Sequence, residues 1–191
     1  MSFHPSLLTP QSKAKRMMLW FAMISMTMMF AGLTSAYVVS KARPDWLTDF
    51  SLPTAFHFST LVILISSFTF WMAFKMLKAD NAKGVTAYTL ATLVLAIVFS
   101  ISQWAGFNSI VAQGYYFTGA ESTVTTSFLY VLVITHFAHL IGGIVVLLVV
   151  FTQHLKGVYQ RKPLGFTLAH TFWHFLGFLW LYLFVFLFFL R

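Results

Sequence analysis

The sequence predicts an all-α, polytopic membrane protein whose five transmembrane helices form one bundle. Five apolar runs fill most of the 191 residues, and no Asp, Glu, Lys or Arg lies well inside any of them. The composition agrees, because 59% of the residues are hydrophobic and only 8% are charged, a surface that water could not hydrate in a soluble domain. The runs lack the alternation of a transmembrane β-strand, so each can satisfy its backbone polar groups only as a helix.

The five expected spans are residues 17–40, 54–74, 85–110, 124–152 and 166–190. Each supplies the roughly 20 residues that a helix needs to cross about 30 Å of hydrocarbon. The loops after the second and fourth spans are short, so the helices that they join must be antiparallel. We expect one membrane domain over residues 1–191, because the chain has no internal repeat and leaves no room for a soluble domain.

The first three spans carry small and polar residues that favour close helix packing. The first has small residues at four-residue spacing, which lets helix backbones approach each other in a membrane. The second carries Ser66, Ser67 and Thr69, whose hydroxyls can bond to their own helix or to a neighbour. In the third, Gln103 interrupts the apolar run. We therefore expect these polar side chains at packed helix faces rather than along a pore.

Histidines are the only ionisable groups inside the fourth and fifth spans. His136 and His139 are three residues apart in the fourth span, and His170 and His174 are four residues apart in the fifth. An ionisable group inside a membrane is costly unless it is paired or functional. We interpret His136, His139 and His174 as neutral imidazoles that hydrogen-bond between helices. An alternative is open, because His139 and His174 lie at similar depths and could be axial ligands of a b-type haem.

The basic residues predict the orientation of the bundle. Nine of them gather at one end: Lys13, Lys15, Arg16, Lys75, Lys78, Lys83, Lys156, Arg161 and Lys162. Only Lys41, Arg43 and Arg191 lie at the other end. The positive-inside rule therefore places the N-terminus in the cytoplasm and the C-terminus at the outer face. The net charge of +8 is explained by this topology, so we expect no nucleic-acid partner.

Motifs in the last two spans resemble a known family. Phe172-Trp173-His174-Phe175, followed by Trp180-Leu181-Tyr182-Leu183-Phe184, is similar to the Tyr-Trp-His-Phe-Val-Asp-x-x-Trp-Leu-Phe-Leu stretch of that family. The pattern His136-x-x-His139 followed by glycines agrees as well. The family is subunit III of haem-copper terminal oxidases, in the short five-helix form of bacterial cytochrome c and quinol oxidases. The resemblance runs in order over all five spans.

Three positions depart from the family pattern. Members often carry a glutamate where this chain has Met26, a second glutamate where it has Gly106, and an aspartate where it has Gly177. Any role of those carboxylates in the family cannot be transferred to this chain.

The resemblance implies a non-redox structural subunit of a proton-pumping oxygen reductase in the bacterial inner membrane. Such a chain has no catalytic, metal-binding or cofactor-binding residue of its own; haem and copper belong to the catalytic subunit I on which it packs. It would meet the other oxidase subunits, stabilise subunit I, aid proton uptake in aerobic respiration, hold phospholipid, and could join a larger respiratory supercomplex.

Lipid contacts could come from Arg161 and Lys162, which would neutralise a phosphate, and from Trp173, which would accept acyl chains. The same cations are also explained by topology alone. A membrane-anchor cytochrome with its own haem is the second reading of the chain, and a small transporter is disfavoured by the lack of carboxylates in the spans.

Overall fold

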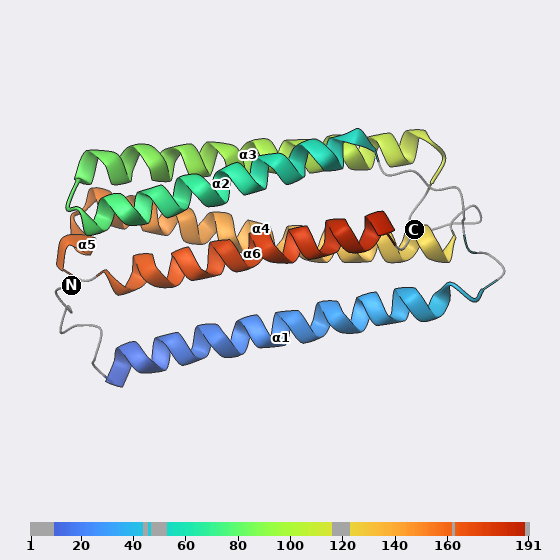
Figure 1. Cartoon of the computed structure of the whole chain (residues 1–191), viewed down its shortest axis with the longest axis horizontal. Helices are drawn as coiled ribbons and strands as arrows, with labels where there is room; N and C mark the ends of the chain where they lie inside the picture. Colours follow the sequence, from blue (N-terminus) through green and yellow to red (C-terminus); the bar gives the residue numbers. More distant parts are fainter. Residues whose placement is uncertain (1–9, 44–45, 47–52, 116–122, 162, 190–191) are drawn as a thin grey trace.

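The structure, a computed structural model, describes residues 10–43, 46, 53–115, 123–161 and 163–189, and these form helices joined by turns (Figure 1). Within these ranges, five helices are long and apolar enough to cross a membrane, which agrees with the predicted all-α class and the number of candidate spans. The helices are α1 (Pro10–Ser40), α2 (Thr54–Lys78), α3 (Ala82–Ala112), α4 (Val124–Leu155), α5 (Val158–Arg161) and α6 (Leu164–Phe189).

Several helices extend beyond the apolar runs at the basic end of the bundle. The α2 helix continues to Lys78 because its lysines lie over aromatic rings, with Lys75 Nζ 4.8 Å from the centre of the Trp71 ring and Lys78 Nζ 4.4 Å from that of Phe74. The turn to α3 is tight, and the side chain of Asn81 caps α3 by accepting a hydrogen bond from Gly84 N at 3.0 Å. Hydropathy alone underestimates such helices, because basic side chains can extend along apolar surface while their charge stays in water.

The short α5 helix was not expected from the sequence, which gives no periodicity over four residues. It follows Gly157, whose φ of 70° ends α4 in a conformation that favours glycine. Its Tyr159 is buried against Phe166 and donates a hydrogen bond to Gln153 Oε1 at 2.9 Å. Burial raises the pKa of the Tyr159 phenol, so it remains a donor at neutral pH. The contact ties the connection between α4 and α6 to the bundle.

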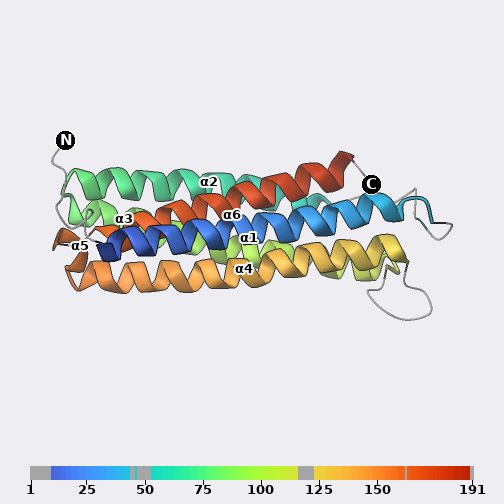
Figure 2. The same ribbon diagram turned by 90° about the horizontal axis from the view of Figure 1, so that it is seen from below.

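The helices form a closely packed group of four with α1 along one side (Figures 1 and 2). The α2 and α3 helices run antiparallel along most of their length, and α4 and α6 lie between this pair and α1. The α1 helix packs on α4 and α6, through Phe30, Tyr37 and a 2.9 Å hydrogen bond between Thr34 Oγ1 and Tyr182 Oη. The opposite face of α1 exposes large apolar side chains, including Trp20 and Met28. Such a face suits lipid or another membrane protein.

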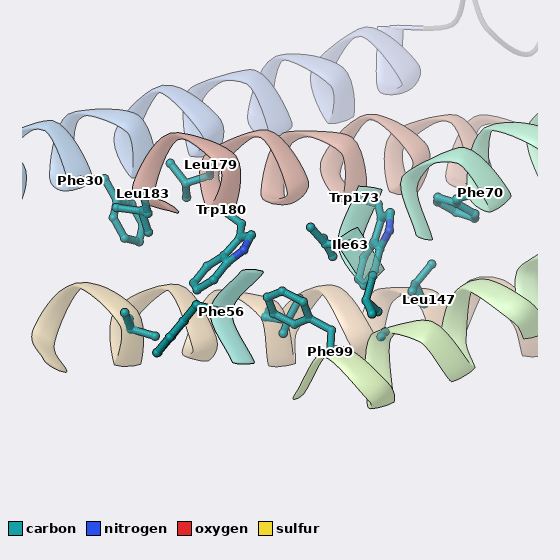
Figure 3. Packing of buried hydrophobic residues seen from close by; sticks show 14 of the residues in the cluster. Phe30, Phe56, Ile63, Phe70, Phe99, Leu147, Trp173, Leu179, Trp180 and Leu183 are labelled. Atoms are coloured by element: carbon teal, nitrogen blue, oxygen red, sulfur yellow. The ribbon is translucent and has the colours of Figure 1, made fainter. Parts of the chain in front are cut away.

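Aromatic side chains fill the interior of the bundle (Figure 3). Trp173 and Trp180 project from α6 and are buried, and the Trp180 ring contacts Phe56 of α2 and Phe99 of α3 at centroid distances of 6.1 and 5.3 Å. Gly143 of α4 makes room for this layer, since a Cβ there would lie 2.6 Å from Leu176 Cδ1 and 3.3 Å from the Trp173 ring. Because Gly143 has no Cβ, the α4 backbone at this point lies directly against Leu176 and Trp173 of α6.

Adjacent glycines in α4 test this packing. Replacing Gly143 by Val should lower the free energy of unfolding by about 1–3 kcal/mol, because the new side chain overlaps Leu176 and Trp173. Gly142→Val is the matched control, since nothing lies within 4 Å of a Cβ at Gly142. Unfolding by SDS, followed by tryptophan fluorescence in mixed micelles, measures both variants. Equal stabilities would show that the close approach at Gly143 is not required.

Candidate functional site

A row of hydroxyls on α2 receives side-chain hydrogen bonds from α6. Trp180 Nε1 donates to Thr60 Oγ1 at 3.1 Å, and Trp173 Nε1 donates to Ser66 Oγ at 3.2 Å. Thr60 can accept because its own hydroxyl proton is directed to the carbonyl oxygen of Phe56, 2.8 Å away in the preceding turn. Both tryptophans are buried, so these bonds satisfy indole N–H groups that no water reaches. The bonds fix the rotation of α6 against α2.

The same side of α2 also bonds to α3. Gln103 Nε2 donates to Ser59 Oγ at 2.7 Å, and Thr69 Oγ1 lies 2.9 Å from Thr92 Oγ1. Gln103 and Ser59 are both buried, which makes their bond difficult to replace by water. Gln103, Ser66 and Thr69 thus take part in three separate bonds between α2 and its neighbours, with Ser59, Trp173 and Thr92 respectively. Ser67 lies beside Gly177 of α6, where a Cβ would be 3.0 Å from Ser67 Oγ.

His136 is enclosed by rings. It is 1% exposed and lies near Trp180, Phe30 and Phe99, at ring-centroid distances of 5.2, 6.4 and 6.5 Å. Among the residues that the structure describes, neither ring nitrogen of His136 has a hydrogen-bond partner. The imidazole therefore acts here as a flat ring in an aromatic layer.

His139 and His174 bond within their own helices, which differs from the expected bonds between helices. His139 Nδ1 lies 2.7 Å from the carbonyl oxygen of Thr135, one turn earlier in α4. His174 Nε2 lies 3.0 Å from His170 Nε2 in α6, so one of the two nitrogens carries the proton and the other accepts it. Similar depth did not bring His139 and His174 together, because each imidazole has a partner on its own helix.

The structure does not bring together the two histidines considered as axial ligands of a b-type haem, since His139 Nδ1 bonds to Thr135 and His174 Nε2 bonds to His170. Axial ligation needs two imidazole nitrogens on opposite faces of one porphyrin. His136 is packed against three aromatic rings. The described part of the chain contains no group of three or more His, Cys, Asp or Glu placed to hold a metal ion.

The expected lipid contacts are only partly described. Lys162 and the side chain of Arg161 lie outside what the structure describes. Trp173 is 1% exposed and lies between α6, α2 and Gly143 of α4, so it belongs to the interior rather than to a lipid-facing wall. The sequence suggested that Trp173 accepts acyl chains, whereas the close approach of Gly143 on the facing helix leaves the indole buried in the structure.

Sequence reasoning missed a polar contact of His154 at the basic end. This residue lies in the last turn of α4, and its Nε2 is 3.1 Å from the carbonyl oxygen of Ala82 and 3.2 Å from Thr86 Oγ1 in the first turns of α3. Its position after the apolar run suggested a loop residue. The sequence indicates that the end of α4 and the start of α3 lie at the same end of the bundle. This position alone does not identify Ala82 or Thr86 as the partner of His154.

Comparison with known proteins gives one consistent family. The family model described as cytochrome c oxidase subunit III matches residues 9–191. The chain is 27% identical to cytochrome c oxidase subunit 3 of Bacillus sp. (strain PS3), over 92% of this chain and 86% of that protein. It is 28% identical to cytochrome c oxidase subunit 3 of Thermostichus vulcanus, over 85% of this chain and 80% of that protein. It is also 27% identical to quinol oxidase subunit 3 of Bacillus subtilis, over 86% of this chain and 81% of that protein.

The bond between Gln103 and Ser59 can be measured by a double-mutant cycle. We expect Gln103→Leu and Ser59→Ala to couple by roughly 0.6 kcal/mol and at most about 2, the range of interhelical hydrogen bonds in membranes. Pairing Gln103→Leu with Ser66→Ala is the control, because Ser66 binds Trp173 two turns away on α2. SDS-induced unfolding supplies the free energies, and additivity in both cycles would contradict a stabilising bond.

Proposed function

Because the chain belongs to the cytochrome c oxidase subunit III family, we propose that it is the non-redox structural subunit of a proton-pumping haem-copper oxygen reductase in aerobic respiration. It packs on and stabilises the catalytic subunit I, which carries haem and copper, and it meets the other oxidase subunits. The observation that carries the proposal is the family match, which covers every one of the five long helices. Relatives named for cytochrome c oxidase and for quinol oxidase share this part, so the electron donor is decided elsewhere in the complex.

The interior of the bundle supports a scaffolding role. Several buried hydroxyl, amide and indole groups of α2, α3 and α6 form hydrogen bonds between these helices, as in Gln103 with Ser59 and Trp180 with Thr60. Buried, bonded polar pairs of this kind fix one arrangement of packed helices. A neighbouring catalytic subunit gains from such a partner because it is held in one conformation during turnover.

The proposed role in proton uptake is indirect. Two positions where the family often has carboxylates are glycines in close contact here: a Cβ at Gly106 would lie 3.1 Å from the Phe56 ring, and one at Gly177 would lie 3.0 Å from Ser67 Oγ. Met26 takes the place of the third acid. The chain therefore aids proton uptake by supporting subunit I, and not through intramembrane acids of its own.

The proposed location is the bacterial inner membrane, with the N-terminus in the cytoplasm. The orientation is supported by the basic residues at that end of the bundle, which lie near the start of α1, in the turn between α2 and α3, and in the connection through α5. Arg161 and Lys162 would bind lipid phosphates there. The exposed apolar face of α1 would contact lipid or oxidase subunits, including those of a supercomplex.

Purification tests the proposed partner. A tagged copy, extracted in a mild detergent and identified by mass spectrometry, should bring down a haem-copper catalytic chain, and the preparation should show a Soret band. After dissociation, the band should remain with the catalytic chain. Absence of that chain from a gently solubilised preparation would contradict the proposal, and a Soret band that stays with this chain would favour the membrane-anchor cytochrome.

Substitution of His174 distinguishes a structural role of this chain from a direct part in the reaction of the oxidase. We expect His174→Leu to lower the yield of assembled complex, because it removes the bond to His170 beside α2. Turnover per assembled complex should stay near the wild-type value, since the proposed role of this chain is structural. Gly142→Leu, at an open position of α4, controls for a change in hydrophobic bulk. A normal yield with lost turnover would indicate a direct part in the reaction.

A further inference from the structure

Two residues in the interior of the bundle keep buried polar atoms that no printed bond of the fold satisfies. They are His136 of α4 and Gln103 of α3, each 1% exposed. Within the described ranges, both ring nitrogens of His136 and Oε1 of Gln103 have no hydrogen-bond partner. Such atoms are costly in surroundings that bulk water does not reach, and a buried water is the usual partner where protein atoms supply none.

The orientation of the Gln103 amide is fixed by its partner on α2. Ser59 Oγ donates its only proton to the carbonyl oxygen of Phe56, 2.9 Å away, so toward Gln103 it can only accept. Gln103 therefore presents Nε2 to Ser59 at 2.7 Å, and Oε1 occupies the other branch of the amide. The two atoms cannot exchange places without loss of this bond. The amide oxygen is thus an acceptor that points away from Ser59.

His136 and Gln103 lie in one layer of the interior, beside Trp180 and Phe99 (Figure 3). The ring of Phe99 is 5.3 Å from that of Trp180 and 6.5 Å from that of His136. Phe99 and Gln103 are four residues apart on one face of α3. One turn of helix rises about 5.4 Å. A single water with two hydrogen bonds of about 2.7–3.2 Å each can span such a separation.

The rings around His136 leave space at its edges. Its contacts with Phe30 and Phe99 are edge-on, with planes inclined at 66° and 74° and centroids 6.4 and 6.5 Å apart. Aromatic pairs span roughly 4.5–7 Å, so neither ring is at its closest approach. The π face of such a ring can accept an imidazole N–H. The other nitrogen of His136, which carries a lone pair, is then left for a water.

We propose that one buried water links α3 to α4 by donating to Oε1 of Gln103 and to the unprotonated nitrogen of His136. A neutral imidazole has one N–H and one acceptor nitrogen, and a water has two protons to donate, so this arrangement satisfies both acceptors at once. The N–H of His136 is directed at the face of a neighbouring ring. The site concerns the interior of this chain and does not depend on the proposed function.

A double-mutant cycle in the full-length chain tests the water. His136→Phe keeps a flat ring but removes both nitrogens, so the water is lost and Oε1 of Gln103 becomes unsatisfied. In SDS-induced unfolding we expect an increase in the unfolding equilibrium constant of about fivefold or more. The same substitution should have no such effect in the Gln103→Leu background, which lacks the amide oxygen. Thr69→Val is the control background and should keep the full effect, because Thr69 bonds to Thr92, about three turns from Gln103 along α3.

Without the water, removing two unsatisfied nitrogens from a buried ring should change stability equally in all three backgrounds. Equal effects of His136→Phe in wild type and in Gln103→Leu would therefore overturn the proposal.

An experimental map of the wild-type chain, in whatever complex it is purified, needs no variant. It should show a peak about 2.7–3.2 Å from Oε1 of Gln103 and from one nitrogen of His136. Absence of this peak from a map that resolves other interior waters would also overturn the proposal.

Discussion

The structure depends on a single constraint, which is that hydrocarbon offers no hydrogen-bond partner to a polar group. The backbone meets it by forming helices, and many hydroxyls meet it by donating to their own preceding turn, as Thr60 does to Phe56 and Thr92 does to Tyr88. A hydroxyl that donates a hydrogen bond in this way still has lone pairs that can accept another. In α2 these lone pairs accept from Trp180 and Gln103, so local satisfaction on one helix creates the acceptors that hold its neighbours.

Packing then decides which faces meet. With little hydrophobic gain between helices in lipid, close contact of atoms supplies much of the association energy. Glycines at Gly106, Gly143 and Gly177 each lie against a side chain of another helix. The large rings of α6 fill the space that such approaches leave, so aromatic side chains occupy much of the described interior.

The sequence predicted much of the fold and less of the site, for physical reasons. Span length and hydropathy are properties of a single helix, so five long helices could be expected from the chain alone. Periodicity likewise placed Gln103 and Thr69 on packed faces, but it could not name Ser59 or Thr92 as their partners, because that depends on rotation between helices. The histidines show most clearly what the sequence cannot predict. The similar depths of His139 and His174 in the membrane suggested that their side chains could come together, whereas each imidazole bonds to a group one turn away on its own helix.

The peripheral position of α1 has a consequence for biogenesis. The α2 and α3 helices are adjacent in the chain and can pair as soon as they enter the membrane, whereas α1 packs on α4 and α6, which are synthesised after α2 and α3. At about 5–20 residues per second, α1 waits on the order of ten seconds for these neighbours. During that interval its exposed apolar surface must be shielded by lipid or by the insertion machinery, so α1 reaches its final place only after helices that follow it in the chain.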